Sequence, residues 1–398
     1  MKILYLHQYF ITPKEAGGAR SYYLAKQLVE DGHEVTVITS NTKNKDWKFL
    51  EVKNIDGIEV KYIKNYYDSS MGKIERIFAF FKFMIYSTYY ALKEKNIDII
   101  FASTTPLTIG IPAYFKKLFN KNAKFIFEVR DVWPDIPYEM GYIKSKLLFK
   151  ILKAFENKLY KSADKIITIS EGIKQKINTS SQDKTYVYPF GANLKLFNTH
   201  KSDEWKKSNN INCKTLYVFT GAIGFANGVE YLIEAAKILS EQNNKEIHIA
   251  IIGQGSAKKS IVNLKDEYSL SNVTIFDSVA VEELNKIYES ADAGVILFGN
   301  LSESYRFTAS PNKFFDYIAA GLPFFFNFGG PLKEKVEKEN IGIYTDYADP
   351  NDLAKKMSHY SDNKEILQLI GKNARNIAER EYDRDVILKN MARDIVNA

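Results

Sequence analysis

Short apolar runs alternate with helical segments along the whole chain. In the first half these runs lie at 2–6 (KILYL), 34–39 (EVTVIT), 97–103 (IDIIFAS), 124–129 (KFIFEV), 165–170 (KIITIS) and 186–189 (YVYP). In the second half they lie at 215–220 (TLYVFT), 248–253 (HIAIIG), 273–278 (VTIFDS), 293–299 (AGVILFG) and 322–330 (LPFFFNFGG). Near-continuous apolar strands separated by helices are typical of parallel sheets covered on both faces. The pattern therefore predicts an α/β protein built from doubly wound parallel sheets.

Two of the intervening helices can be placed from their apolar spacing. A helix is expected from about Ala19, with Gly32 as its C-terminal cap, because apolar residues recur on one face between them. A second helix is expected over 229–242, where apolar residues recur at i, i+3, i+4 and i+7. Each helix follows one predicted strand and precedes another, which is the order of a β-α-β unit.

A polar stretch at 198–213, NTHKSDEWKKSNNINC, interrupts this rhythm and is the best candidate for a linker. The chain of 398 residues is long enough for two domains. We therefore expect two Rossmann-like domains, 1–197 and 214–398, facing each other across a cleft. The charged stretch 364–398 is expected to be helical, and packing of its last helix against the first domain is one option.

Composition narrows the class of protein. A hydrophobic share of 45% and a charged share of 26% describe an ordinary globular protein. The single cysteine, Cys213, excludes an internal disulfide framework and a cysteine-rich metal cluster. The five histidines show no paired metal-ligand spacing. We expect neither a metal nor another cofactor. The chain opens without a secretory leader, which favours a reducing, cytoplasmic location.

Charge is distributed unevenly between the two halves. Residues 1–200 contain 31 Lys and Arg against 20 Asp and Glu, whereas residues 201–398 contain 24 against 28. A basic half suggests an anionic partner, such as a membrane surface, a phospholipid-like substrate or a nucleic acid. No nucleic-acid recognition motif accompanies it, and the alternative is a lysine-rich composition without functional meaning.

Two apolar stretches flanked by lysines could lie on a membrane surface. The first, at 77–92, is interrupted by Lys82 and is shorter than the roughly 20 residues that span a bilayer. The second, at 144–161, is a basic amphipathic run. Both stretches would equally suit core helices of a basic protein.

Ligands of open parallel sheets bind beyond the carboxyl ends of the strands, so the loops there hold the candidate residues. Gly17 and Gly18 separate the first strand from a helix, where backbone N–H groups can approach a phosphate. Gly221 and Gly224 form a similar turn after the strand at 215–220. Purely structural turns remain an alternative at both places.

The segment 303–325 is the most informative loop. Pro311 favours a helix start, so Asn312 and Lys313 fall in its first turn and Asp316 lies one turn further on the same side. A lysine in a first turn opposes the helix dipole, which suggests that it is kept to hold a phosphate, with Asp316 binding a ribose diol. Arg306 is a second candidate cation. A solvated surface lysine is the alternative.

The strand at 124–129 ends in Arg130, Asp131 and Trp133, an arrangement of charges and an aromatic face that suits a sugar. The alternative is a structural ion pair beside a core tryptophan. His7, just after the first strand, and Arg20, at the start of the following helix, are further candidates for the acceptor side or sugar wall.

Together these loops resemble the family-4 retaining glycosyltransferases, whose fold, called GT-B, has two facing Rossmann-like domains. The motifs that carry the similarity are the Gly-Gly loop at 17–18, ISEGIKQKI at 169–177, YPFGANLKLF at 188–197, GAIGFANGVEYLIEAA at 221–236, IIGQG at 251–255 and PNKFFDYIAAGLP at 311–323. HQYF at 7–10 with EVRDVWP at 128–134 is most similar to the bacterial fucosamine-transferase-like group, which builds O-antigen and capsule repeats.

The resemblance implies a donor nucleotide on the C-terminal domain, an acceptor on the N-terminal domain and no metal. The sequence also departs from the family pattern. Ala222 and Asn227 stand where relatives have the arginine and lysine that bind the diphosphate, and Thr308 and Asp316 replace the usual pair of glutamates. We therefore assign the diphosphate to Lys313, helped by Arg306 and by backbone N–H groups at the glycines. The resemblance places Arg130 and Asp131 near the donor sugar, and we count them with Lys313 as catalytic candidates.

The resemblance implies transfer of a sugar, with retention, from a UDP-sugar, or less readily a GDP-sugar, to a lipid-diphosphate-linked saccharide. The expected place of action is the cytoplasmic face of the inner membrane, in O-antigen or capsule synthesis, with an N-acetylated amino or deoxy sugar as donor. Two alternatives remain open, a UDP-sugar 2-epimerase of the same architecture and a non-catalytic sugar-nucleotide-binding relative. A role in nucleic-acid binding is not expected.

Overall fold

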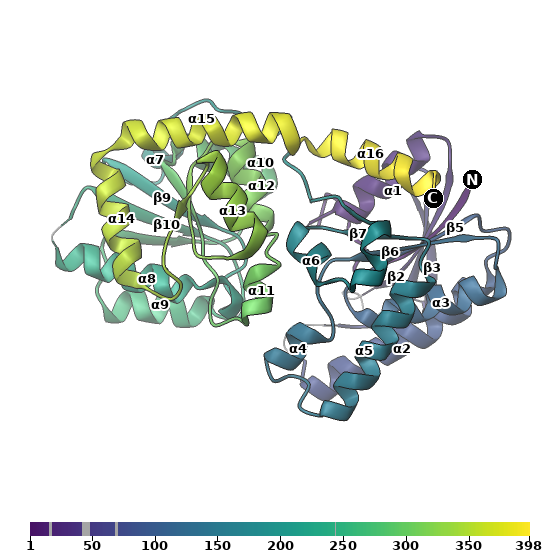
Figure 1. Ribbon diagram of the computed structural model, residues 1–398. Coiled ribbons are helices and arrows are strands. Elements are labelled where there is room, and N and C mark those ends of the chain that lie inside the picture. Colours follow the sequence, from purple (N-terminus) through teal and green to yellow (C-terminus); the bar gives the residue numbers. More distant parts are fainter. Residues whose placement is uncertain (16–17, 42–47, 68–70, 243) are drawn as a thin grey trace. The chain divides into compact units, whose positions relative to one another are not determined.

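The computed structural model describes residues 1–15, 18–41, 48–67, 71–242 and 244–398 (Figure 1). The chain divides into two compact units. The first contains Met1–Pro189 together with Val386–Ala398, and the second contains Phe190–Asp385. Each unit is built on one sheet.

The sheet of the first unit has eight strands in the order β3-β4-β2-β1-β5-β6-β7-β8. Its strands are β1 (Lys2–Leu6), β2 (Glu34–Asn41), β3 (Leu50–Ile55), β4 (Ile58–Lys64), β5 (Ile99–Ser103), β6 (Lys124–Val129), β7 (Lys165–Thr168) and β8 (Thr185–Val187). All neighbouring strands are parallel except β3 and β4, which are antiparallel. The predicted apolar strands at 2–6, 124–129 and 165–170 are therefore confirmed as buried parallel strands.

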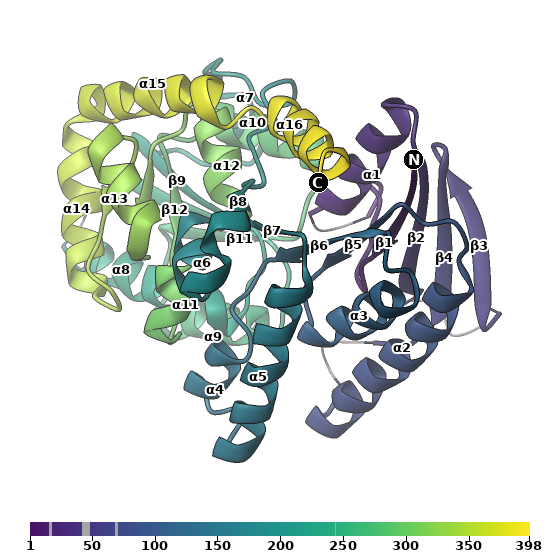
Figure 2. The same ribbon diagram turned by 45° about the vertical axis from the view of Figure 1, so that its right-hand side comes forward.

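Helices cover both faces of this sheet (Figures 1 and 2). The helical segments of this part of the chain are α1 (Arg20–Glu30), α2 (Lys73–Lys93), the 3-10 turn η1 (Leu107–Ile109), α3 (Gly110–Phe119), α4 (Asp135–Glu139), α5 (Lys146–Ser162), α6 (Glu171–Lys176) and the 3-10 segment η2 (Thr179–Lys184). On one face α1 packs with the last helix of the chain, α16 (Arg384–Val396), whose Leu388, Met391 and Ile395 share a core with Ile3 and Tyr5 of β1. Helices α2, α3 and α5 lie on the opposite face.

The β3–β4 hairpin is an element that the apolar pattern did not predict. Both strands have exposed or half-buried positions along much of their length, so neither forms a continuous apolar run. The turn between them holds Asp56 at φ 49° and Gly57 at φ 86°. Positive φ at both central residues is typical of a tight hairpin turn, for which Asp-Gly is a preferred pair.

The sheet of the second unit has six parallel strands in the order β11-β10-β9-β12-β13-β14. These strands are β9 (Thr215–Thr220), β10 (Ile247–Ile252), β11 (Val273–Phe276), β12 (Ala293–Ile296), β13 (Phe324–Phe326) and β14 (Ile343–Tyr344). Its helical segments are α7 (Glu204–Ser208), the 3-10 turn η3 (Phe225–Asn227), α8 (Val229–Glu241), α9 (Lys258–Glu267), α10 (Val281–Ser290), α11 (Glu303–Phe307), α12 (Asn312–Ala319), α13 (Gly330–Glu339), α14 (Pro350–Asp362) and α15 (Lys364–Glu381). Two units with parallel sheets confirm the predicted α/β class.

The two predicted helices are present, as α1 and α8. On α8 the four apolar positions that predicted it are all buried in the core of the second unit. On α1 the chain leaves the helix through Gly32, which has a φ of 87°. Such a backbone favours glycine, as the expected cap requires.

The stretch at 198–213, expected as a linker, lies within the second compact unit. It contains α7, and Trp205 of that helix is buried with its ring 5.2 Å from the ring of Phe276. The Nζ of Lys201 donates a hydrogen bond to the carbonyl oxygen of Ala291 at 2.8 Å. The division between the units falls instead after Pro189. The polar composition of 198–213 led to the wrong boundary, because the single buried ring of Trp205 packs this otherwise polar segment against the rest of the second unit.

Candidate functional site

The carboxyl ends of the parallel strands in the second unit bring together the loops that follow β9, β10, β12 and β13. Helix α12 begins close to these loops, with Pro311 as its N-cap. The predicted helix start and the place of Lys313 in the first turn are both confirmed.

Lys313 reaches from α12 to the end of β9. Its Nζ lies 3.6 Å from the centre of the Phe219 ring. A Cβ built on Gly221 would lie 3.5 Å from the Cε of Lys313, so this side chain and the Gly221 turn are in direct contact. The Nζ is shielded from solvent and has no hydrogen-bond partner within the described ranges. Burial lowers the pKa of Lys313 to about 7. The ammonium group is therefore held without its usual partners, which an anion would supply.

Asp316 lies one turn further along α12. Burial raises the pKa of its carboxyl to about 7, and the positive charges of Arg384 and Lys313 oppose this rise. Behind it the hydroxyls of Tyr288 and Thr220 are hydrogen-bonded at 2.8 Å, which joins α10 to the end of β9. Two ionisable groups with pKa values displaced toward neutrality are typical of functional sites.

Arg306, the second predicted cation, lies at the end of α11. Its guanidinium carbon is 3.8 Å from the centre of the Tyr347 ring. Its Nε is buried and lacks a hydrogen-bond partner among the residues that the structure describes. The hydroxyl of Tyr347 donates a hydrogen bond to the carbonyl of Gly299 in the loop after β12. The guanidinium group of Arg306 thus stacks on Tyr347 beside the same sheet edge. Its Nε–H remains available to donate a hydrogen bond to a ligand.

The glycine turn after β9 allows close approach of the backbone, although not in the way that we expected. Gly221 has a φ of 127°, and its N–H donates to the carbonyl of Ile252 at 2.9 Å. The expectation that this N–H faces a phosphate is therefore wrong, because the bond between neighbouring strand ends occupies it. Gly224 caps η3, and Gly228 begins α8 with a φ of 55°. Gly18 is exposed, and Gly17 lies outside the described residues.

Two other polar residues near this edge are already engaged. Lys258, at the start of α9, donates to the carbonyls of Gly253 and Phe276 and pairs with Asp277 at 2.6 Å. The hydroxyl of Thr308 donates to the carbonyl of Ser304 at 2.9 Å, and Thr308 is buried. Thr308 is uncharged and its hydroxyl is already bonded, so it does not replace the glutamate that relatives have at this position.

Arg20 is a structural residue of the first unit and does not serve as a sugar wall. Its Nε pairs with Glu128 at 2.9 Å, and both side chains are almost completely buried. The guanidinium also donates to the carbonyls of Pro189 and Tyr188 at 2.6 and 2.7 Å. Glu128 accepts a further bond from the hydroxyl of Ser103 at 2.5 Å. Sequence analysis singled out Arg20 but not its partner, which lies in strand β6.

His7 is likewise part of the core. Only 2% of its surface is exposed, and burial together with the charge of Arg130 lowers its pKa to about 3. The imidazole is therefore neutral at physiological pH. The expected role of His7 at the acceptor is therefore not supported by its position.

Arg130 and Asp131 follow β6, beside the loop that follows β5. The backbone N–H of Arg130 donates to the hydroxyl of Thr104 at 2.8 Å, and Asp131 accepts from the hydroxyl of Thr105 at 2.5 Å. Trp133 is half-buried next to them. These three residues remain together and partly accessible at the carboxyl edge of the first sheet. Thr105 is the positioning residue that sequence analysis did not find.

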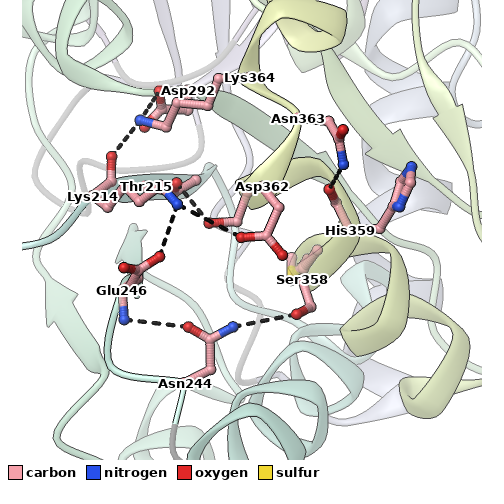
Figure 3. Close-up of polar contacts among 12 residues, drawn as sticks. Lys214, Thr215, Asn244, Glu246, Asp292, Ser358, His359, Asp362, Asn363 and Lys364 are labelled. Atoms are coloured by element: carbon pink, nitrogen blue, oxygen red, sulfur yellow. Dashed lines mark hydrogen bonds and ion pairs between the residues drawn. The ribbon is translucent and has the colours of Figure 1, made fainter.

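A hollow of about 810 Å³ lies at the opposite, amino edge of the second sheet. Its lining includes Lys214, Asp292 and Lys364. Figure 3 shows the polar contacts of these three residues and their neighbours. Lys364 pairs with Asp292 at 2.8 Å, and Lys214 pairs with Glu246 at 2.9 Å. Most of the polar groups drawn there are hydrogen-bonded or ion-paired with one another. In this they differ from Lys313 and Arg306 at the carboxyl edge, which each have a polar atom without a partner among the described residues. The described residues contain no group of three potential metal ligands.

Comparisons with known families match both parts of the chain. The family model described as Glycosyltransferase Family 4 matches residues 17–196, and the model described as Glycosyl transferases group 1 matches residues 201–377. The chain is a glycosyltransferase of the GT-B type. Among curated proteins, it is 24% identical to the uncharacterized glycosyltransferase MJ1607 of Methanocaldococcus jannaschii, over 97% of this chain and 94% of that one.

Solved structures of other glycosyltransferases share the GT-B fold. Sucrose-phosphate synthase from Thermosynechococcus elongatus superimposes with a TM-score of 0.76 at 17% identity, over 100% of this chain and 98% of that one. HepE of Anabaena, solved in complex with UDP and glucose, superimposes with a TM-score of 0.71 at 16% identity, over all of both chains. The fucosamine-transferase-like subgroup finds no counterpart among these matches.

Proposed function

We propose that this glycosyltransferase transfers a sugar from a UDP-sugar to a lipid-diphosphate-linked saccharide during synthesis of a bacterial surface polysaccharide. The observation that carries the donor assignment is Lys313, a shielded ammonium with no hydrogen-bond partner within the described ranges. A diphosphate would supply charge-assisted hydrogen bonds to this group and remove its desolvation cost. The complexes of HepE with UDP and with UDP-glucose support a donor that carries uridine diphosphate. A GDP-sugar is the second choice.

The donor is bound by residues of the second unit. Lys313 holds the diphosphate, and the Gly221 turn lets the ligand approach because its backbone carries no side chain. Asp316, one turn further along α12, accepts hydrogen bonds from the ribose hydroxyls once its carboxyl is ionised. Arg306 contributes a second positive charge through its unused Nε. Pro311 and Asn312 position the first turn of α12.

The acceptor is bound by the first unit, where Arg130, Asp131 and Trp133 lie at the carboxyl edge of the sheet. An aromatic face beside charged groups suits a saccharide, since the ring contacts the apolar side of a sugar and the charges bind its hydroxyls. We propose an N-acetylated amino or deoxy sugar as the unit transferred, following the similarity of EVRDVWP to the fucosamine-transferase-like group.

Catalysis would depend on the charge that builds on UDP as it leaves. Lys313 stabilises that charge from a fixed position, so little reorganisation is needed during the reaction. The departing phosphate accepts the proton of the acceptor hydroxyl, as in retaining relatives, and the anomeric configuration is retained. We propose that this reaction uses neither a metal ion nor a cofactor, and that it occurs at the cytoplasmic face of the inner membrane.

Calorimetric titration of UDP, GDP, ADP and NAD into the protein without added metal tests the donor assignment. We expect selective binding of UDP, weakened by Lys313→Ala by more than about 1 kcal/mol, the scale of one charge-assisted hydrogen bond. Lys355→Ala, which removes an exposed lysine of α14, is the matched control. Unchanged affinity in Lys313→Ala would place the diphosphate elsewhere.

Product analysis separates transfer from the two alternatives. With the UDP-sugar alone, a transferase produces at most slow hydrolysis, whereas a 2-epimerase converts the sugar into its epimer. With a lipid-linked acceptor, a transferase extends the saccharide and releases UDP. Tight UDP binding with no turnover on a panel of acceptors would instead indicate a non-catalytic relative.

A further inference from the structure

Helix α2 has apolar side chains on two opposite faces, of which only one is covered. Ala79, Phe83 and Ala91 point into the first unit and are buried. The other face carries large apolar residues that are 38–70% exposed: Ile74, Ile77, Phe78, Phe81, Ile85, Tyr89 and Leu92. Their spacing of three and four residues places them along a single stripe. A helix that serves only the core would have polar residues there.

The same arrangement recurs on the two helices next to α2. On α3 the exposed residues are Phe115, Leu118 and Phe119, and on α5 they are Leu147, Leu148 and Ile151. The residues of α3 are spaced i, i+3, i+4 and those of α5 are spaced i, i+1, i+4. Each set therefore lies on one face of its helix. Phe119 and Leu147 are 77% and 70% exposed.

The three helices form one layer. Helix α3 contacts both α2 and α5, and all three lie on the same face of the sheet (Figures 1 and 2). The stripes are the sides that the sheet leaves uncovered. We call the exposed residues of the three stripes, the seven of α2, the three of α3 and the three of α5, the three-helix apolar surface. Monomeric proteins rarely expose so many large apolar side chains on neighbouring elements without a partner.

Positive charges outnumber negative ones on helices α2 and α5. Helix α5 carries five lysines, and its one acid, Glu156, is buried. Helix α2 carries three lysines and one arginine against one acid, Glu75. The two lysines of α3 do not add to this charge, because Lys116 is buried and Lys117 pairs with Asp164 at 3.0 Å.

The Nζ of Lys93 lies 4.3 Å from the Tyr89 ring, and that of Lys158 lies 4.8 Å from the Tyr114 ring. These two ammonium groups therefore lie over the faces of aromatic rings of the same three helices, so positive charge and apolar side chains are next to each other.

We propose that the three-helix apolar surface inserts into the interface of a bilayer that contains anionic lipids. Its apolar stripes would enter the region between headgroups and acyl chains, and its lysines would contact the headgroup phosphates. No helix among the described residues is long and apolar enough to cross the membrane, so the contact is made from one side. A second copy of the chain is a poorer occupant, because two such surfaces face to face would bring their lysines together.

This inference deepens the proposed function by naming the surface that brings the enzyme to its lipid-linked acceptor. Its physical basis is nevertheless independent of the donor site, since every residue of the surface belongs to the first unit and Lys313 belongs to the second. Membrane binding and UDP binding can therefore fail separately.

Co-sedimentation of the full chain with vesicles tests the inference. One set of vesicles contains phosphatidylcholine alone, and the other contains phosphatidylcholine with phosphatidylglycerol, both at low salt. We expect the protein to pellet with the anionic vesicles and to be released as salt rises. Ile77→Asp and Leu147→Asp should each lower the partition coefficient by about tenfold or more. Leu369→Asp, at a 55% exposed leucine of α15 in the second unit, is the matched control and should bind as the wild type does.

Circular dichroism and UDP titration of each variant show whether it is folded and keeps its donor site. The inference is overturned if the wild type stays in the supernatant with anionic vesicles at low salt. It is also overturned if Ile77→Asp and Leu147→Asp pellet like the wild type. A wild-type dimer that both substitutions dissociate, with no vesicle binding, would assign the surface to a second copy instead. Vesicle binding without UDP binding would support the surface and contradict the proposed donor.

Discussion

The ammonium group of Lys313 lies on the face of the Phe219 ring, 3.6 Å from its centre, and this ring is completely buried. An aromatic face attracts a cation by roughly 1–2 kcal/mol. It does not replace the hydrogen bonds that an ammonium group makes in water, which is why the pKa of Lys313 falls to about 7. Burial of this ammonium group therefore costs free energy, and a bound anion would reduce that cost.

Lys313→Met should therefore lose UDP binding and gain stability. Methionine fills similar space without a charge, so we expect the free energy of unfolding to rise by about 1–3 kcal/mol. A base with a lowered pKa binds fewer protons when folded, and its destabilising effect is largest below pH 7 and fades as pH rises toward 10.5. Chemical unfolding at pH 6 and pH 10 should show the gain mainly at pH 6. A loss of stability at both pH values would contradict this account.

The affinity for UDP should fall as pH rises above 7. The protonated amine binds the diphosphate, and its pKa of about 7 in the free protein means that each further pH unit costs up to about tenfold in affinity. Lys313→Arg keeps its charge throughout this range, so its affinity should stay nearly constant between pH 7 and 9. Calorimetry across that range measures both proteins. A wild-type profile as flat as that of the arginine variant would show that Lys313 is not the titrating contact.

Arg20→Met should destabilise the first unit by about 3–5 kcal/mol, because it leaves the buried carboxylate of Glu128 without its main partner. Arg20 also holds the pKa of Glu128 below its usual range, against the effect of burial. A carboxyl with a lowered pKa stabilises the fold above its unfolded pKa, and that contribution is lost as pH falls through the folded value. Lys26→Met, at a half-buried residue of the same helix, is the control. Thermal melts that do not distinguish the two variants would contradict a structural role for Arg20.

Gly253→Ala should disturb the turn beneath Lys313. A Cβ at this position would lie 1.9 Å from the carbonyl oxygen of Gly221, so the turn after β9 must move. We expect a loss of about 2 kcal/mol in stability and a clear drop in UDP affinity. Gly329→Ala meets no atom within 4 Å and is the comparison. Equal UDP affinity in both variants would show that the turn does not shape the donor site.

The apolar pattern was sufficient to predict the parallel sheets, because strands such as β1 and β6 are buried on both faces and read as unbroken apolar runs. The same pattern did not predict the β3–β4 hairpin, where the Asp56-Gly57 pair was the only local signal of a turn. It also misplaced the linker, since nothing local reveals that Trp205 packs against Phe276.

The candidate site shows the same limit. Lys313 was found from sequence because it stands against the local preference of a helix start. The role of Arg20 could not be found in this way, because Arg20 begins helix α1 and its partner Glu128 lies 108 residues away along the chain, in strand β6. His7 was misjudged for a similar reason, since burial depends on tertiary packing that no local pattern records.

The last helix of the chain completes a unit that began at the first strand. Leu388, Met391, Ala392 and Ile395 occupy the core that surrounds β1, whereas Phe190–Asp385 forms the second unit as one continuous segment. On the ribosome, all the residues of the second unit emerge before the final residues of the first. The first unit therefore keeps an open face until residues 386–398 have been synthesised, although its first strand is synthesised before the whole second unit. A chain that stopped at Asp385 would have its second unit complete and its first unit lacking part of its core.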